Sequence, residues 1–156
     1  MSNEDLLRPT LSDHQPVPEL YNSTGFYMSS FFGGPLGAAI YGGANSLRLG
    51  RLSKDLPSFM ILVGVAYLLP YMLHDAGWLQ GLAASIGGRI SRNYGLFMRV
   101  LGLVTCGAIY LMHRQFFRSA RVSGAKENPG WVPGLVAFAA GMAANAAFVS
   151  WLLKHH

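Results

Sequence analysis

The sequence predicts an all-α integral membrane protein, a bundle of four transmembrane helices. Of its 156 residues, 51% are hydrophobic and only 12% are charged, whereas a soluble domain carries about 25% charged residues. This composition also excludes a disordered chain, which needs low hydrophobicity and high charge. Three runs of 28, 19 and 26 residues contain no Lys, Arg, Asp or Glu; they are residues 20–47, 56–74 and 128–153. About 20 helical residues cross a bilayer, so each run is long enough.

These runs place the first, second and fourth helices at about 24–47, 56–74 and 131–153. A third helix at about 94–113 is expected if Arg99 extends its side chain to the headgroups, as arginine near a helix end can. Backbone groups in lipid must be satisfied within each segment, which favours helices throughout.

The remaining segments are too short or too polar to cross the membrane. Residues 1–22 form a polar tail, and residues 23–156 form one transmembrane domain. Residues 76–88 carry Trp78, Leu79, Leu82 and Ile86 at helical spacing and are expected to be an interfacial or re-entrant segment.

Basic residues indicate the orientation, because loops rich in Lys and Arg stay in the cytoplasm. The loops after the first and third expected helices hold seven: Arg48, Arg51, Lys54, Arg114, Arg118, Arg121 and Lys126. The other side receives four: Arg8, Arg89, Arg92 and Lys154. We therefore expect both termini to be periplasmic. The pairs Tyr21/Tyr41 and Trp131/Trp151 are each 20 residues apart, about 30 Å along a helix, which suits aromatic belts at two interfaces.

Small residues recur at four-residue spacing in two of the expected helices. The rows include Gly33, Gly34, Gly37, Ala38 and Gly42 in the first helix, and Ala137, Gly141, Asn145, Ala143 and Ala147 in the fourth. Such rows let helix backbones approach closely in lipid. They serve either as seams within the bundle, which is the more economical interpretation, or as an interface with a partner or a second copy.

Four further residues stand out within the expected spans. Pro35 and Pro70 are expected to kink the first and second helices. Asn145 lies near the centre of the fourth, where hydrogen bonding between helices or a polar site would satisfy it. Arg99 is an intramembrane charge, for which Asp75 is the expected counter-charge, in either a structural pair or a functional site.

No pattern predicts a catalytic, cofactor or metal site. Ser, His and Asp occur without grouping, and phosphate-binding glycine motifs are missing from the sequence. The pairs His74–Asp75 and His155–His156 lack further ligands at helical spacing. The net charge of +5 follows from the asymmetry of the loops and does not point to nucleic acid.

The segment from Leu20 to Arg51 carries a resemblance. Its run Leu-Tyr-Asn-Ser-Thr-Gly-Phe-Tyr-Met-Ser-Ser-Phe-Phe-Gly-Gly-Pro-Leu-Gly and its later Asn45-Ser-Leu-Arg-Leu-Gly-Arg51 resemble the opening of small uncharacterised bacterial inner-membrane proteins. The resemblance implies a bacterial, polytopic protein and transfers no functional residues. In its small size and its lack of catalytic motifs, the chain is also similar in type to membrane-embedded toxin-immunity proteins.

Together these features favour a non-enzymatic bacterial inner-membrane protein that acts by helix–helix association with another membrane protein. An immunity protein against a membrane-targeting toxin and an accessory subunit of a membrane complex both fit. The alternative is an oligomeric transporter or channel for a small solute, in which broken helices and Arg99 with Asp75 would line the path.

Overall fold

A computed structural model describes residues 20–78, 81, 85, 90–122 and 128–154, and their principal elements are four α-helices. They are α1 (Ser23–Arg48), α2 (Leu52–Asp75), α4 (Ile90–Val122) and α5 (Trp131–Lys154). Three segments are long and apolar enough to cross a membrane: Leu52–Asp75, Asn93–Ser119 and Trp131–Lys154. The all-helical prediction is therefore confirmed, and three of the four expected spans have the length and hydropathy that a membrane crossing needs.

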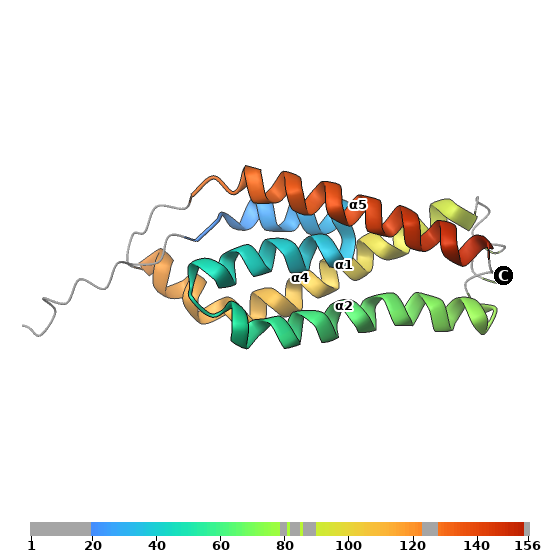
Figure 1. The fold of residues 1–156 in the computed structure, drawn as a ribbon, viewed down its shortest axis with the longest axis horizontal. Coiled ribbons are helices and arrows are strands. Elements are labelled where there is room, and N and C mark those ends of the chain that lie inside the picture. The colour runs from blue at the N-terminus through green and yellow to red at the C-terminus, as the bar shows by residue number, and fades with distance from the viewer. Residues whose placement is uncertain (1–19, 79–80, 82–84, 86–89, 123–127, 155–156) are drawn as a thin grey trace, which may run out of the picture.

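The helix α1 is not a straight rod, because the chain reverses at Gly34 (Figure 1). The amide of Tyr21 donates to Asn45 Oδ1 at 2.9 Å, and the Tyr41 hydroxyl donates to the Asn22 carbonyl at 2.9 Å. In a continuous helix, residues 22 and 41 would lie about 28 Å apart. The expectation of one crossing helix at about 24–47 is therefore wrong. Residues 23–33 and 35–48 instead form the two arms of a helical hairpin.

Local backbone chemistry explains the reversal. Gly34 has φ 65° and ψ −156°, a conformation that is essentially restricted to glycine. Pro35 follows, and its fixed φ and missing N–H suit the first position of a new helix. The sequence predicted a kink at Pro35, but glycine before it permits a complete turn. The second arm has about 14 residues and is about 21 Å long, too short to cross the bilayer.

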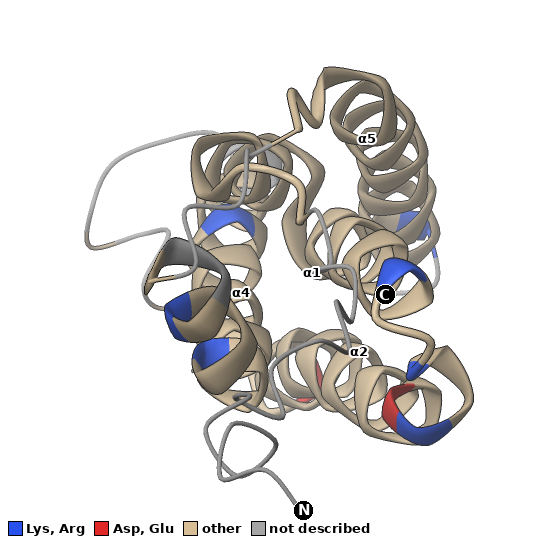
Figure 2. Ribbon diagram, turned by 90° about the vertical axis from the view of Figure 1, so that its left-hand side faces the viewer, with Lys and Arg blue, Asp and Glu red and all other residues tan. Residues whose placement is uncertain are grey.

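The hairpin lies between α2, α4 and α5 (Figure 2) and packs mainly against α4 and α5. Its buried core consists of Phe26, Ala38, Tyr41, Phe59, Cys106, Ile109 and Ala137. Beyond the hairpin, the three long helices contact one another directly. The rings of Tyr71 and Trp151 are 6.0 Å apart there, and Tyr94 and Leu152 are buried. The hairpin thus fills one half of the bundle, and aromatic packing closes the other.

The hairpin also changes which ends of the chain lie together. The amide of Asn128 donates to the Leu20 carbonyl at 3.0 Å, just before α5 begins. Lys154 lies at the far end of α5 (Figure 1). Residue 20 and residue 154 are therefore at opposite ends of the bundle. The expectation that both termini lie on one side does not hold for these described ends, because α1 returns to the side on which it began.

Basic residues gather at the end of the bundle where the described chain begins, which we call the basic end (Figure 2). Among the described residues they include Arg48, Arg51, Lys54, Arg114 and Arg118. Most of the expected segment 76–88 and residues 1–19 of the tail lie outside the described residues. Trp131 and Trp151, at the two ends of α5, are 67% and 45% exposed.

Candidate functional site at the hairpin tip

The hairpin tip, Gly33 and Gly34, is held between glycines of two other helices. A Cβ at Gly102 of α4 would overlap the Ser30 carbonyl and the Gly34 backbone. A Cβ at Gly141 of α5 would overlap the backbone of Gly33. Only glycine permits these approaches, so the tip is fixed by backbone packing from both sides.

Asn145 satisfies the polar groups that the break exposes. Its Nδ2 donates to the Gly33 carbonyl at 3.2 Å, and its Oδ1 accepts from the Tyr67 hydroxyl at 2.7 Å. The reversal at Gly34 removes the helical donor that Gly33 would otherwise have, and an unpaired carbonyl in an apolar interior is unfavourable. Asn145 therefore joins the tip of α1, the middle of α2 and α5.

The other small residues singled out in the sequence also lie within the chain. A Cβ at Gly37 would meet the carbonyls of Ser29 and Ala137, so this glycine packs the two arms together and against α5. Gly42 lies against Ile109 of α4. Ala38 and Ala137 are completely buried. These four residues form seams within the bundle, whereas Ala143 and Ala147 are exposed on α5.

Arg99 and Asp75 are not brought together. The Arg99 guanidinium lies 5.5 Å from the centre of the Phe31 ring and 5.9 Å from that of Phe32. Asp75 is exposed at the last position of α2. Arg99 instead borders a pocket of about 290 Å³ between α4 and α5 that reaches the hairpin, and Asn145 and Ser150 are among its polar lining residues.

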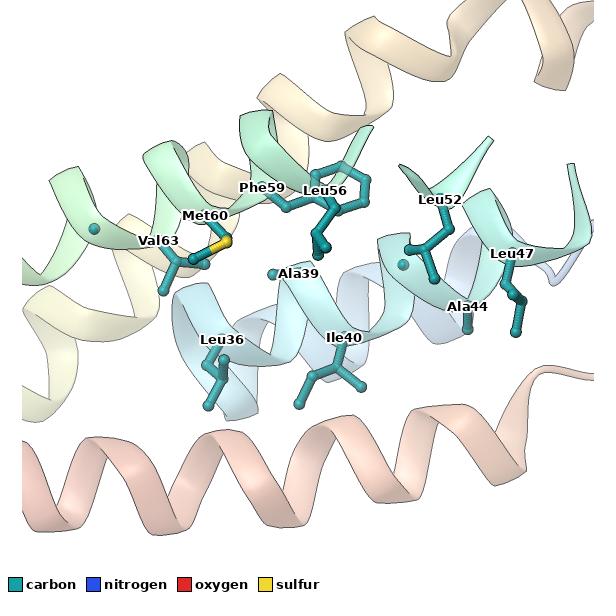
Figure 3. A pocket seen from close by; sticks show the side chains of 12 residues that line it. Leu36, Ala39, Ile40, Ala44, Leu47, Leu52, Leu56, Phe59, Met60 and Val63 are labelled. Atoms are coloured by element: carbon teal, nitrogen blue, oxygen red, sulfur yellow. The ribbon is translucent and has the colours of Figure 1, made fainter. Parts of the chain in front are cut away.

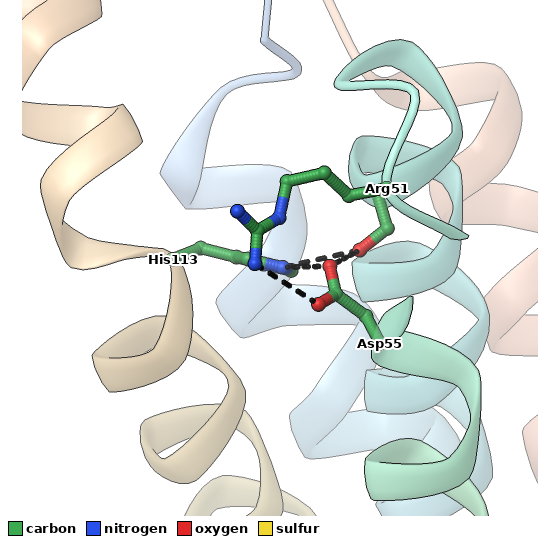
Figure 4. A network of polar contacts seen from close by, with 4 residues as sticks. Arg51, Asp55 and His113 are labelled. Carbon is green, nitrogen blue, oxygen red and sulfur yellow. Dashed lines mark hydrogen bonds and ion pairs between the residues drawn. The ribbon is translucent and has the colours of Figure 1, made fainter. Parts of the chain in front are cut away.

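A second polar cluster joins three elements near the basic end (Figure 4). Asp55 Oδ2 lies 2.9 Å from His113 Nε2 and accepts a 2.9 Å hydrogen bond from the Ser46 hydroxyl. Arg51 Nη2 is 3.7 Å from Asp55 Oδ1. Ser46, Asp55 and His113 are at most 4% exposed. The cluster ties the second arm of α1 to α2 and α4.

The sequence interpretation that nothing groups Ser, His and Asp is therefore wrong. The geometry nevertheless differs from that of a catalytic serine, which contacts one imidazole nitrogen while the carboxylate contacts the other. Here the Ser46 hydroxyl, at 3.1 Å, and the Asp55 carboxylate both approach His113 Nε2. The arrangement suits a buried structural contact among three helices.

One sequence signal could have found this cluster. The buried residues of α2 are Asp55, Phe59, Ala66, Pro70 and His74. Their spacings of 4, 7, 4 and 4 define a single helix face. A polar residue in register with an apolar stripe faces the interior and needs a partner.

A scan against protein-family models, a search of curated proteins and a search of solved structures found no match to this chain.

Proposed function

We propose that the protein is a non-enzymatic membrane protein that acts by helix–helix association with another membrane protein. Its setting would be the bacterial inner membrane, with the basic end in the cytoplasm, where Lys and Arg are retained. An immunity protein against a membrane-targeting toxin and an accessory subunit of a membrane complex are the two roles of this kind. Gly33, Gly37 and Gly141 pack the hairpin against α5. The contact surface for another protein must therefore lie elsewhere.

The observation that carries the proposal is a row of exposed small residues on α5: Ala139, Ala143 and Ala147. We call it the outer row. Its four-residue spacing keeps it on one helix face, opposite the buried Ala137 and Gly141. Association in lipid depends on close packing and not on hydrophobic transfer, so small residues on a lipid-facing surface favour a helix partner.

The test is a photo-crosslinking amino acid placed at position 143 in cells that contain the native partners. We expect a discrete adduct of higher mass whose second component, identified by mass spectrometry, is a membrane protein or a second copy of this chain. Ala143→Leu in a chain that carries the crosslinker at position 139 should reduce the adduct at least about tenfold, because a bulky side chain separates the two backbones.

Gly107→Leu is the matched control, because Gly107 lies on α4 and a Cβ there would have nothing within 4 Å. It should leave the adduct unchanged. Adducts that persist in Ala143→Leu, or that never form from positions 139 and 143, would overturn the proposal. Gly141→Leu is unsuitable, because it should disrupt the hairpin tip itself.

One observation favours a second function, transport of a small solute by an oligomer. The pocket beside Arg99 brings a cation and the amide of Asn145 together where the chain reverses. Broken helices and intramembrane charges mark solute sites in transporters. Solute flux into vesicles containing the purified protein, and its loss in Arg99→Ala, would support this function. Vesicles that stay impermeable at high protein content would count against it.

A further inference from the structure

An apolar groove of about 580 Å³ runs between the second arm of α1 and α2 (Figure 3). Leu56 and Met60 line it from α2, and Leu36 and Ile40 line it from the second arm. Gly43 and Gly64 widen it. A Cβ at Gly64 would have nothing within 4 Å, and one at Gly43 would meet only Leu52 Cδ1 at 3.8 Å.

The groove has the length of one leaflet. On α2 its lining extends from Leu52 to Gly64, and on α1 from Leu36 to Leu47. Twelve helical steps amount to about 18 Å, and half of the hydrocarbon core is about 15 Å thick. Because the second arm ends at the hairpin tip, the groove stops near the middle of the bundle. This geometry matches a single acyl chain and is too short for a partner helix that crosses the membrane.

Charge at the groove mouth complements an anionic headgroup. The turn that joins the two walls carries Arg48, Arg51 and Lys54, directly beside Leu47 and Leu52. Arg48 and Lys54 are exposed; the Arg48 guanidinium also stands 3.9 Å from the Tyr21 ring centre, and Arg51 contacts Asp55. Basic residues next to a membrane surface attract anionic lipids. The groove therefore offers an apolar channel of leaflet depth with cations at its open end.

We propose that this groove binds one acyl chain of an anionic phospholipid from the leaflet at the basic end. The phosphate lies at the turn of Arg48 and Lys54, and the chain extends toward Leu36 and Gly64. The site is independent of the outer row on α5, because it lies on the α1–α2 face.

The test is native mass spectrometry of the full chain, taken from vesicles with equal amounts of phosphatidylglycerol and phosphatidylcholine of identical acyl chains. We expect one phospholipid per chain, with phosphatidylglycerol enriched. Gly64→Leu should abolish retention of that lipid, because the side chain fills the groove. The control Gly107→Leu adds the same side chain on α4 and should retain it.

A charge variant separates headgroup from chain recognition. Arg48→Gln with Lys54→Gln should keep one bound lipid and lower the preference for phosphatidylglycerol by about fivefold per removed charge. Lys154→Gln, at the other end of the bundle, should leave the preference unchanged. Equal retention in Gly64→Leu and Gly107→Leu, with helicity and melting temperature preserved, would overturn the site. An unenriched wild type would overturn its selectivity for anionic lipid.

Discussion

The rings of Tyr21 and Tyr41 meet edge to face, with their centroids 6.0 Å apart. Gly130, just before α5, lies against both, since a Cβ there would overlap the Tyr41 hydroxyl and lie 2.8 Å from Tyr21 Cβ. The Arg48 guanidinium stands 3.9 Å from the Tyr21 ring centre. The base of the hairpin is thereby closed by Tyr21 before the first arm, by Tyr41 and Arg48 of the second arm, and by Gly130 before α5.

This closure predicts the sidedness of the chain. Cysteines introduced one at a time at Ser2, Ser53 and Lys154 should divide into two groups toward a membrane-impermeant maleimide in sealed vesicles. Positions 2 and 53 should label from the same side, and position 154 from the other. The native Cys106 is completely buried, so the unmodified chain should give no signal. Labelling of positions 2 and 154 from one side would instead indicate four crossings.

Substitution of Gly34 should destabilise the hairpin. Gly34→Ala places a side chain in a conformation that disfavours it by about 1–3 kcal/mol, and its Cβ would overlap Asn145 Nδ2. The matched variant Gly95→Ala, in an open part of α4, should stabilise the protein by about 0.5–1 kcal/mol, because alanine favours a helix interior. Unfolding in mixed micelles measures both. Equal effects of the same sign would show that Gly34 is not the point of reversal.

The Asn145 contacts should be measurable as a coupled pair. Tyr67→Phe removes one hydrogen bond and Asn145→Ala removes two. Such bonds contribute about 0.6 kcal/mol each and at most about 1.7 kcal/mol in membrane proteins. The double variant should lose less stability than the sum of the single variants, because they share one bond. Strict additivity in a double-mutant cycle would mean that Tyr67 and Asn145 do not interact.

The buried carboxylate of Asp55 should make His113 important for stability. His113→Leu leaves a buried carboxylate without its closest ionisable partner, and breaking such pairs lowers stability by about 3–5 kcal/mol. Arg51 lies farther away, at 3.7 Å, and is partly exposed, so it compensates little. Asp55→Leu with His113→Leu should recover much of the loss, because no charge then remains buried. A double variant that is less stable than His113→Leu would contradict this account.

Composition and charge spacing correctly predicted a helical protein with helices long and apolar enough to cross a membrane, and they predicted the positions of α2, α4 and α5. They failed at α1, where an uncharged run has the same appearance whether it crosses or turns back. The informative detail was the pair Gly34–Pro35, which was interpreted as a kink. Whether the chain turns back there depends on Gly102, Gly141 and Asn145, which are remote in sequence. The two glycines leave room for the backbone of the turn, and Asn145 donates a hydrogen bond to its carbonyl.

The rows of small residues predicted only part of the packing, because spacing within one helix carries no information on which other segments lie beside it. Their spacing correctly indicated close backbone contact, and both Gly33 and Gly141 make it. Spacing alone does not distinguish an inner face from an outer one, however. The Ser46–Asp55–His113 cluster was missed because its members are 9 and 58 residues apart and only the hairpin brings them together.

The hydrogen bond between Gly33 and Asn145 joins residues 112 positions apart, with a consequence for biogenesis. The hairpin tip is translated 112 residues before the side chain that donates to it. Until α5 is inserted, the Gly33 carbonyl at this turn lacks the hydrogen bond from Asn145. We therefore expect the nascent hairpin to remain beside the insertion machinery or at the membrane surface until α5 has been inserted. A chain that is truncated before α5 should fail to fold and should be degraded by membrane proteases.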